Sequence, residues 1–337
     1  MRVLVIGGTN FLGPAVVERL IDGGHDVTLF HRGVSEAAAP SGVPHIHGDR
    51  RQIGEFRADI ESLAPDVVLD MAAMCGEDAL AVVDACAGIV RRAVMISSAD
   101  VYRAYGRLHS SEPGPIEPTP IDEEAPLRER LFPYRGERGG RLDDYDKIPA
   151  EEAYRADVRI TTTVLRLGAV HGERDSQRRL LMELARMDAG RPAILVQEDM
   201  LEWRWSRAYA GNVADAIALA VADARAAGRT YNIAEPGAMS QAEWLRAVGR
   251  IAGWRGDIIP VPGNRLPEHL RTPNNYAQHL ELDTSRIRRE LGFAERVSRD
   301  EGIARAIAWE RTHPPERVSP RWTDFAAEDA VLASLGR

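Results

Sequence analysis

The first third of the chain alternates short segments of strand-like pattern with segments of helical periodicity. The segments that predict strands are Val3–Ile6, Val27–Phe30, His45–His47, Val67–Met71 and Ala93–Ile96. Helical periodicity fills the gaps between them at Leu12–Asp22, Ile53–Leu63 and Asp78–Ala87. Mostly apolar strands that alternate with helices are typical of a parallel sheet covered on both faces. The predicted fold class is therefore α/β, with a Rossmann-type doubly wound parallel sheet.

Beyond the first third of the chain, the alternation of predicted strands and helices becomes less regular. A sixth strand is predicted at Thr162–Leu167, after a helix that starts near Ile148. Residues 106–144 carry six prolines and little periodicity, which predicts an inserted loop with room for part of a lid. The later predicted elements are helices at Gln177–Ala189, Val213–Ala224 and Gln241–Ala252 and strands at Ala193–Val196 and Thr230–Ala234. We expect one domain over 1–170 plus about 209–235, and a smaller mixed α/β C-terminal lobe over about 171–208 plus 236–337.

Composition narrows the class of protein. The chain has 337 residues and a formal net charge of −8, which argues against a nucleic-acid partner. No apolar run approaches the roughly 18 residues of a membrane span, and the apolar start is too short for a signal peptide. The two cysteines, Cys75 and Cys86, cannot form a disulfide framework. We therefore expect a cytoplasmic protein without membrane contact.

A glycine-rich turn, Gly7-Gly8-Thr9-Asn10-Phe11-Leu12-Gly13, directly follows the first strand and opens a helix. In this βα context the pattern predicts a dinucleotide site, because the helix N-terminus offers unpaired N–H groups to a pyrophosphate. Gly7 permits the tight turn, and Gly13 lets the helix pack closely on the strand. Asn10 replaces the usual middle glycine, and asparagine tolerates the left-handed region better than other residues do.

The end of the second strand bears on the choice of nicotinamide cofactor. NAD-preferring sites place an acidic residue there for the ribose hydroxyl, but this chain has His31 followed by Arg32. Arg32 is able to pair with a 2′-phosphate, which favours NADP. The alternative is that Arg32 is a solvated loop residue and that the cofactor is NAD.

His45, His47 and Asp49 would share one face of the third strand, as metal ligands can. No further cluster of His or Cys supports a metal site. We expect no metal, and we interpret Asp49 as part of the adenine pocket.

Several ordered motifs carry a family resemblance. They are Gly7–Gly13, Gly48-Asp49-Arg50, Ile96–Tyr102, Leu165–Gly172, Tyr231-Asn232-Ile233, Leu282–Arg286 and Glu290–Phe293. Together they resemble an extended short-chain dehydrogenase/reductase of the NAD-dependent epimerase/dehydratase type, over most of residues 1–312. This resemblance implies hydride transfer between a nicotinamide cofactor and a polar substrate such as a nucleotide sugar, which the smaller lobe would bind.

The resemblance also implies roles for particular residues. Asp49 would bind the adenine amino group, Ala169 and Val170 would lie beside the nicotinamide, and Ser98 would be the catalytic hydroxyl residue. The full expected cofactor set is Gly7, Thr9, Asn10, Phe11, Leu12, Gly13, His31, Arg32, Asp49, Arg50, Met71, Ala72, Ala73, Ser97, Lys147, Ala169 and Val170. A homodimer is expected by analogy with the family.

The catalytic segment departs from the family pattern. The family pairs a catalytic Tyr with a Lys four residues later, so that both lie on one helix face. Here the residue four after Tyr145 is Pro149, and Lys147 lies two residues on. Alignment on Lys147 restores the following residues but puts Asp143 in the Tyr position. Because Pro is best tolerated in a first turn, the helix is expected to start at about Lys147, which leaves Tyr145 on its approach.

Lys147 is the single lysine among 43 basic residues, and it falls beside the segment where the family needs one. We expect an altered site with Ser98, Tyr145 and Lys147 as its catalytic residues. The functional hypothesis is an NAD(P)-dependent epimerase, dehydratase or reductase. The alternative is a non-catalytic NAD(P)-binding protein, either an RNA-binding or a redox-sensing relative. The arginines around Arg286 are interpreted as a solvated helix face.

Overall fold

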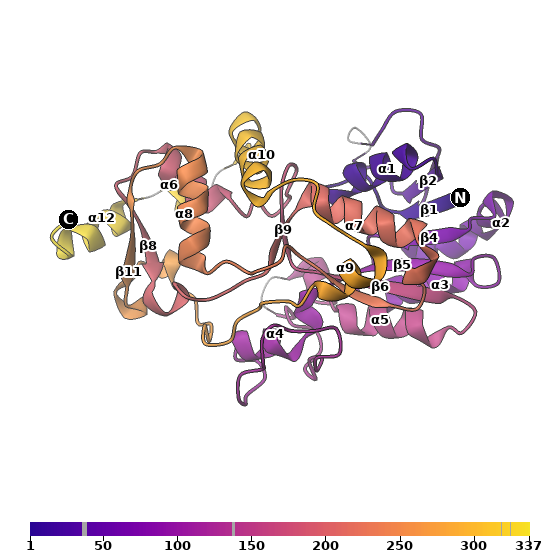
Figure 1. The fold of residues 1–337 in the computed structure, drawn as a ribbon, viewed down its shortest axis with the longest axis horizontal. Coiled ribbons are helices and arrows are strands. Elements are labelled where there is room, and N and C mark those ends of the chain that lie inside the picture. The colour runs from indigo at the N-terminus through magenta and orange to yellow at the C-terminus, as the bar shows by residue number, and fades with distance from the viewer. Residues whose placement is uncertain (36–38, 137–138, 318, 324) are drawn as a thin grey trace.

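A computed structural model describes residues 1–35, 39–136, 139–317, 319–323 and 325–337. Its centre is a parallel sheet of seven strands in the order β10-β6-β5-β4-β1-β2-β3 (Figure 1). The order reverses between β1 and β4, so the chain winds outward in both directions from the first strand. This topology confirms the predicted doubly wound α/β fold.

The strands of this sheet begin and end close to the predicted positions. They are β1 (Arg2–Ile6), β2 (Asp26–His31), β3 (His45–His47), β4 (Val67–Asp70), β5 (Arg92–Ser98), β6 (Thr161–Leu167) and β10 (Thr230–Ile233). All neighbouring pairs are parallel, as in the register Val3↔Val27 and Val3↔Val67. β1 and β4 are buried along almost their whole length, because helices cover both faces.

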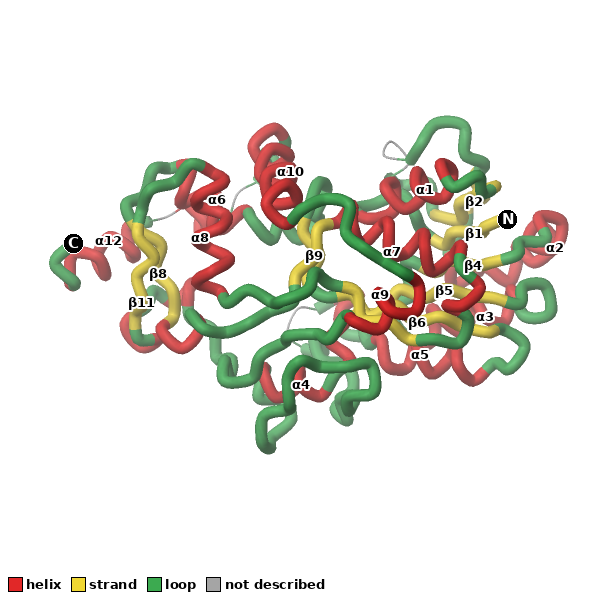
Figure 2. Tube along the Cα trace, in the orientation of Figure 1, coloured by secondary structure: helices red, strands yellow, loops and turns green. Residues whose placement is uncertain are grey.

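Helices form a layer on each side of the sheet (Figure 2). One layer contains α1 (Leu12–Asp22), which packs against α7 (Ala210–Ala222). The other contains α2 (Arg57–Leu63), α3 (Gly76–Cys86) and α5 (Lys147–Ala156). Each layer has its own apolar core, one around Val16, Leu29 and Ile217 and one around Ile6, Val82 and Tyr154.

Two predicted helices are shorter than their periodicity suggests. The segment from Ile53 begins instead as a 3₁₀ helix, η2 (Arg50–Phe56), and α2 follows it. The segment from Gln177 becomes α-helical only at α6 (Leu181–Asp188), because Arg178 has a φ of +51°. A side chain in that left-handed conformation interrupts a right-handed helix. These two predicted starts were wrong.

A second, smaller assembly lies at the end of the molecule away from the N-terminus (Figure 1). It contains the parallel pair β8 (Ala193–Gln197) and β11 (Asp257–Val261), with α6, α8 (Gln241–Ala252), α10 (Arg299–Thr312), α11 (Pro320–Thr323) and α12 (Ala326–Ser334) around it. Between the two assemblies, β7 (Ala169–His171) pairs with β9 (Arg207–Tyr209). The strand β7 directly continues the chain from β6, so it joins the sheet to the smaller assembly.

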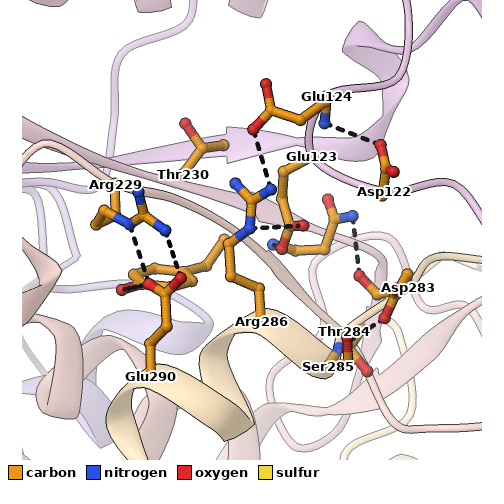
Figure 3. A network of polar contacts seen from close by, with 12 residues as sticks. Asp122, Glu123, Glu124, Arg229, Thr230, Asp283, Thr284, Ser285, Arg286 and Glu290 are labelled. Carbon is orange, nitrogen blue, oxygen red and sulfur yellow. Dashed lines mark hydrogen bonds and ion pairs between the residues drawn. The ribbon is translucent and has the colours of Figure 1, made fainter.

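The proline-rich segment 106–144 contains the end of α4 (Arg103–Leu108) and otherwise mainly turns. A polar network anchors it to β10 and α9 (Ser285–Leu291) (Figure 3). Arg286 pairs with Glu123 at 3.3 Å and with Glu124 at 3.0 Å, while Glu123 accepts the Asn232 backbone N–H at 2.9 Å. Arg286 is therefore a packing residue, and its interpretation as solvated was wrong.

No helix in the described part of the chain is both long and apolar enough to span a bilayer.

Candidate active site

The glycine-rich turn has the conformation that a close backbone approach requires. Gly7 has a φ of +98° and Gly8 a φ of +85°. A Cβ on Gly13 would lie 2.3 Å from the carbonyl carbon of Gly8, so this position needs glycine. The non-glycine residue of the turn that has a positive φ is Phe11, at φ +46° and ψ −104°, and not Asn10 as expected. Asn10 instead accepts hydrogen bonds, through Oδ1 from Phe11 N at 2.9 Å and through its carbonyl from Gly13 N at 2.8 Å.

This turn fits a dinucleotide pyrophosphate. The first-turn N–H groups of α1 have no intrahelical acceptors. No side chain caps this helix and no acidic residue lies in its first turn. The helix dipole also favours an anion near Leu12, at the N-terminus of α1. Gly7 lies against Ala72 and Met71, and a Cβ on Gly7 would contact the Ala72 Cβ at 3.4 Å. The expected cofactor residues of β1 and β4 therefore meet at the switch point of the sheet.

The end of β2 brings its predicted residues to the same edge. Thr9 is hydrogen-bonded through its hydroxyl to Ser35 at 3.0 Å, which links the glycine turn to the loop after β2. Arg32 is exposed beside this loop. His31 is buried, and its Nδ1 accepts the backbone N–H of Gly33 at 3.0 Å. Arg32, rather than His31, is thus the side chain that is accessible to a cofactor phosphate.

Three histidines gather at the ends of β2 and β3. His31 Nε2 lies 2.6 Å from His45 Nδ1, and one ring nitrogen from each of His31, His45 and His47 falls within 4.8 Å of the others. Asp49 is not a member, because its carboxylate accepts Arg51 N at 2.9 Å and caps η2. Two nitrogens on one tetrahedral zinc are about 3.4 Å apart, so the cluster is arranged as a hydrogen-bonded group. The absence of a metal stays a prediction.

Two residues of the expected cofactor set have side chains committed elsewhere. Arg50 donates to both oxygens of Asp70, at 3.0 and 2.7 Å, and to the Asp78 carbonyl at 2.8 Å. Ser97 donates to Glu151 at 2.6 Å, below the sheet and facing α5. These contacts direct both side chains into the protein interior, so the structure does not bring them to the glycine turn.

The segment before α5 explains the irregular spacing of Tyr145 and Lys147. α5 begins at Lys147, as predicted, and Pro149 lies in its first turn. Asp146 caps the helix by accepting Ile148 N at 2.9 Å, and it also pairs with the buried Arg128 at 3.0 Å. Tyr145 precedes the cap in non-helical backbone, so the i, i+4 rule does not govern its direction.

Ser98 and Tyr145 meet at the end of β5. The phenol of Tyr145 donates to Asp100 Oδ2 at 2.8 Å, and Ser98 lies near the same phenol and acts to lower its pKa. Burial, reinforced by the Asp100 charge, raises the pKa of Tyr145 well above its ordinary value. Asp100 was missed by the sequence analysis. The signal for it in the sequence was the position of this carboxylate, two residues after the predicted catalytic Ser98.

Lys147 is buried beside these groups. Its Nζ donates to the backbone carbonyl of Ala73, and to that of Ile96 at 3.1 Å. The amine lies 5.8 Å from the centroid of the Tyr145 ring, and burial lowers its pKa. The three predicted catalytic residues are therefore close together, although Lys147 reaches Ala73 without a direct hydrogen bond to Tyr145.

Two further predicted positions follow β6, whose last residue, Leu167, pairs with Ser98. Ala169 and Val170 lie in β7, directly after the last strand-β6 residues, and both are buried. Tyr102, by contrast, is a packing residue, since its hydroxyl donates to Asn232 at 2.6 Å and Arg166 lies over its ring. The part of the chain after β5, the approach to α5 and β7 together form one edge of the site.

Residues 3–134 match the model of the NAD-dependent epimerase/dehydratase family. This first part of the chain is therefore similar to that family. The match agrees with the motifs identified in the sequence and supports a nicotinamide-dependent enzyme.

Two curated proteins are similar to this chain. It is 29% identical over 308 residues to the 2′-dehydrokanamycin reductase of Streptomyces kanamyceticus, a match that covers 88% of this chain and 79% of the reductase. It is 28% identical over 130 residues to the chloroplast stem-loop binding protein of 41 kDa b from Arabidopsis thaliana. The second match covers 35% of this chain and spans about a third, 34%, of that protein.

Solved structures share the fold of this chain. The UDP-glucose 4-epimerase of Thermus thermophilus, solved with NAD, superposes with a TM-score of 0.67 and 22% identity, over 92% of this chain and 99% of the epimerase. The shared fold and the glycine-rich turn, Gly7–Gly13, which fits a pyrophosphate, together support binding of a nicotinamide cofactor by this chain.

Proposed function

We propose that this enzyme transfers a hydride between NADP and a carbon that carries a carbonyl or secondary hydroxyl group on a polar, sugar-like substrate. The observation that carries the proposal is the meeting of Ser98 and Tyr145 at the edge of the sheet that also holds the glycine turn. A serine hydroxyl and a phenol at one point are suited to hold a substrate oxygen and to exchange a proton with it. When bound, the nicotinamide supplies or accepts the hydride.

Different residues of the chain would bind the substrate, exchange the proton and hold the cofactor. Ser98 would donate a hydrogen bond to the substrate oxygen and orient it, while Tyr145 would exchange the proton. Lys147 fixes the geometry, since its amine ties Ala73, at the end of β4, to Ile96 of β5. Gly7–Gly13 would hold the pyrophosphate. Ala72, Ala73, Ala169 and Val170 would line the nicotinamide side of the site.

The reductase from Streptomyces supports the reductive direction, because it is similar along most of this chain. The substrate class has two candidates, an oxidised amino sugar and a nucleotide sugar. We propose that the residues outside the sheet domain (about 171–208 and 236–337) bind this substrate, and that 1–170 plus about 209–235 bind the cofactor. A homodimer and a cytoplasmic location remain predictions.

The choice of NADP rests on the end of β2. There, the exposed Arg32 and the hydrogen-bonded His31 stand where an NAD-preferring site would place a carboxylate. Arg32→Ala should weaken NADP binding by about 10-fold to 100-fold, since a charge-assisted hydrogen bond contributes about 1.5–3 kcal/mol. Binding of NAD should change little. Fluorescence titration of both cofactors measures this, and tighter binding of NAD to the unmodified chain would refute the preference.

The proposed reaction is tested by following NADPH absorbance with two ketones, a nucleotide 4-keto sugar and an oxidised amino sugar. Tyr145→Phe should lower kcat by about 100-fold or more with little change in NADPH affinity. Tyr154→Phe is the matched control, because it removes a different buried phenol away from Ser98. Equal turnover by Tyr145→Phe and the unmodified chain would remove Tyr145 from the mechanism.

A cofactor-binding protein without turnover is the second candidate. The placement of Lys147 favours it, because the amine is bound to two backbone carbonyls and makes no direct hydrogen bond to the phenol. The RNA-binding version is opposed by the net charge of −8. NADP binding together with no turnover of either ketone would support this candidate over the first.

A further inference from the structure

The site contains a buried carboxylate, Asp100, directly beside the Tyr145 phenol. Asp100 lies in a short 3₁₀ turn, η3 (Ala99–Val101), and 7% of its surface is exposed. Its Oδ2 accepts the Tyr145 hydroxyl at 2.8 Å and lies 3.5 Å from the hydroxyl of Tyr134. Its Oδ1 is buried and, in the described part of the chain, has no hydrogen-bond partner. A buried carboxylate with one bare oxygen is poorly stabilised as an anion.

The charged groups around Asp100 are committed to other partners. Arg128 donates through Nε to the Asp100 backbone carbonyl, while its guanidinium pairs with Asp146. Lys147 donates to backbone carbonyls. Neither cation makes a direct salt bridge to the carboxylate, and Asp146 adds a second negative charge nearby. Burial therefore raises the pKa of Asp100 above its ordinary value, against the opposing effect of the Tyr145 hydrogen bond.

We propose that Asp100 is the proton-accepting partner of Tyr145, an inference that rests on the proposed function. When a substrate hydroxyl is oxidised, its O–H bond breaks and its proton moves to Tyr145 Oη. In the same step the original phenol O–H bond breaks, and that proton moves to Asp100 Oδ2. The substrate C–H bond breaks, and its hydrogen leaves with the electron pair as a hydride to oxidised NADP. Reduction runs the same proton steps in reverse.

The pair of Asp100 and Tyr145 takes the place of the lysine four residues after the tyrosine, a position that is Pro149 in this chain. In a Tyr–Lys arrangement the nearby ammonium stabilises a tyrosinate. Here the amine of Lys147 lies 5.8 Å from the Tyr145 ring, and the pKa of Tyr145 is raised. With Asp100 as acceptor, the phenol is neutral before and after the transfer, so the site needs no stabilised tyrosinate. Asp100 acts on the substrate only through the Tyr145 hydroxyl, so it is a positioning residue.

Further phenols connect Asp100 to the surface. The Tyr134 hydroxyl is 3.5 Å from Asp100 Oδ2 and 2.7 Å from the hydroxyl of Tyr105. The Tyr105 ring packs 4.3 Å from the ring of His109, which is exposed. These hydroxyls give the proton on Asp100 a route to solvent after turnover.

The first test needs neither cofactor nor substrate. Infrared difference spectra of the free protein, recorded as a function of pH, should show the C=O band of a protonated carboxyl persisting above the ordinary Asp range. The band should vanish in Asp100→Asn and should shift in Tyr145→Phe, which loses the hydrogen bond to Oδ2. Asp144→Asn removes an exposed carboxylate of the neighbouring segment and should leave the band unchanged.

The second test is kinetic. Asp100→Asn should lower kcat for alcohol oxidation by about 100-fold while KM and NADP affinity stay close to the original. Oxidation needs the carboxylate, so the unmodified enzyme should lose activity as pH falls through the Asp100 pKa. Asp100→Asn should lack this acidic limb, and Asp144→Asn should keep it. A merely structural role would instead change thermal stability and cofactor affinity without removing the limb.

The results separate the two proposals. If neither ketone nor the matching alcohols are turned over, the proposed function fails, while the infrared titration still decides whether Asp100 and Tyr145 share a proton. If the band is unaffected by both Asp100→Asn and Tyr145→Phe, the partnership is wrong. It is also wrong if an active Asp100→Asn enzyme retains the kcat and acidic limb of the original.

Discussion

Two buried aspartates follow neighbouring strands of the sheet, and each accepts a hydrogen bond from a tyrosine. Asp70 ends β4 and accepts Tyr154 at 2.7 Å, both donors of Arg50, and the backbone N–H of Ala72 at 2.9 Å. Asp100 follows β5 and accepts Tyr145, but among the described residues it has no ion pair and its Oδ1 has no hydrogen-bond partner. Arg50 holds the pKa of Asp70 below its ordinary value despite burial, whereas burial raises the pKa of Asp100.

The difference shows how one residue pair can serve two purposes. Where every carboxylate oxygen is satisfied, the anion is fixed, and the contacts of Asp70 join β4 to η2 and α5. Where one oxygen lacks a partner, the proton is shared more easily and the pair is available for chemistry. The number of donors, rather than burial itself, separates a structural aspartate from one that can exchange a proton.

The largest expected effect lies on the structural side of this comparison. Asp70→Asn leaves the buried Arg50 charge without its carboxylate, so the free energy of unfolding should fall by about 3–5 kcal/mol. Asp100→Asn breaks no direct ion pair and should cost about 1 kcal/mol or less. Urea denaturation at pH 7 measures both. Equal losses would show that the two carboxylates are equivalent supports of the fold.

The tyrosines should respond in the opposite order for activity. Tyr145→Phe should reduce kcat by about 100-fold, which corresponds to about 2.7 kcal/mol, with little change in stability. Tyr154→Phe should leave kcat nearly unchanged and lower stability by about 1.5–3 kcal/mol, since it removes a hydrogen bond to a charged group. Turnover assays and denaturation curves of both variants test this. Loss of activity in Tyr154→Phe alone would reverse the assignment.

His171 extends the comparison to a buried group without any polar partner. Within the described residues neither of its ring nitrogens has a hydrogen bond, and burial lowers its pKa to about 3. Because the unfolded chain binds a proton near pH 6.5 and the folded chain does not, acid favours unfolding. Between pH 7 and pH 5 this group should cost about 2 kcal/mol. His171→Phe should show a correspondingly flatter stability profile, and an unchanged profile would contradict the low pKa.

The smallest effect is a difference in the direction of pH dependence. The folded pKa of Asp100 is raised, so its favourable contribution is present below the unfolded value of about 3.8 and is lost as pH rises through the folded pKa. Asp70 behaves in the opposite way and loses its contribution in acid. Relative to the original chain, Asp100→Asn should therefore gain stability between pH 4 and pH 7. A relative loss over that interval would show that Asp100 is ionised in a favourable environment.

The sequence was informative wherever the determining interactions are local. Strand spacing, the glycine turn and the start of α5 at Lys147 were predicted because each depends on neighbouring residues. The prediction for the turn was wrong in one detail, since Phe11 and not Asn10 has the positive φ. The periodicity also failed where a backbone exception intervened, as at Arg178.

Contacts between distant segments were not predictable in the same way. Asp100 and Tyr145 are 45 residues apart in the chain, and no spacing rule connects them. Arg50 belongs to a recognisable turn, yet its partner Asp70 lies 20 residues on and directs the guanidinium into the core. His31 meets His45 only because β2 and β3 pair in register. Motifs therefore identified the region of the site, whereas the donor count around each carboxylate needed the fold.

The position of Lys147 also provides an intrinsic reporter. It is the one lysine of the chain, and its amine is enclosed between two carbonyls at the start of α5. An amine-reactive reagent can modify this side chain only when that helix end separates from β4 and β5. The rate of such labelling, read by mass spectrometry of one peptide, would measure how often the site opens. Protection by added NADP would then report occupancy of the site without any turnover.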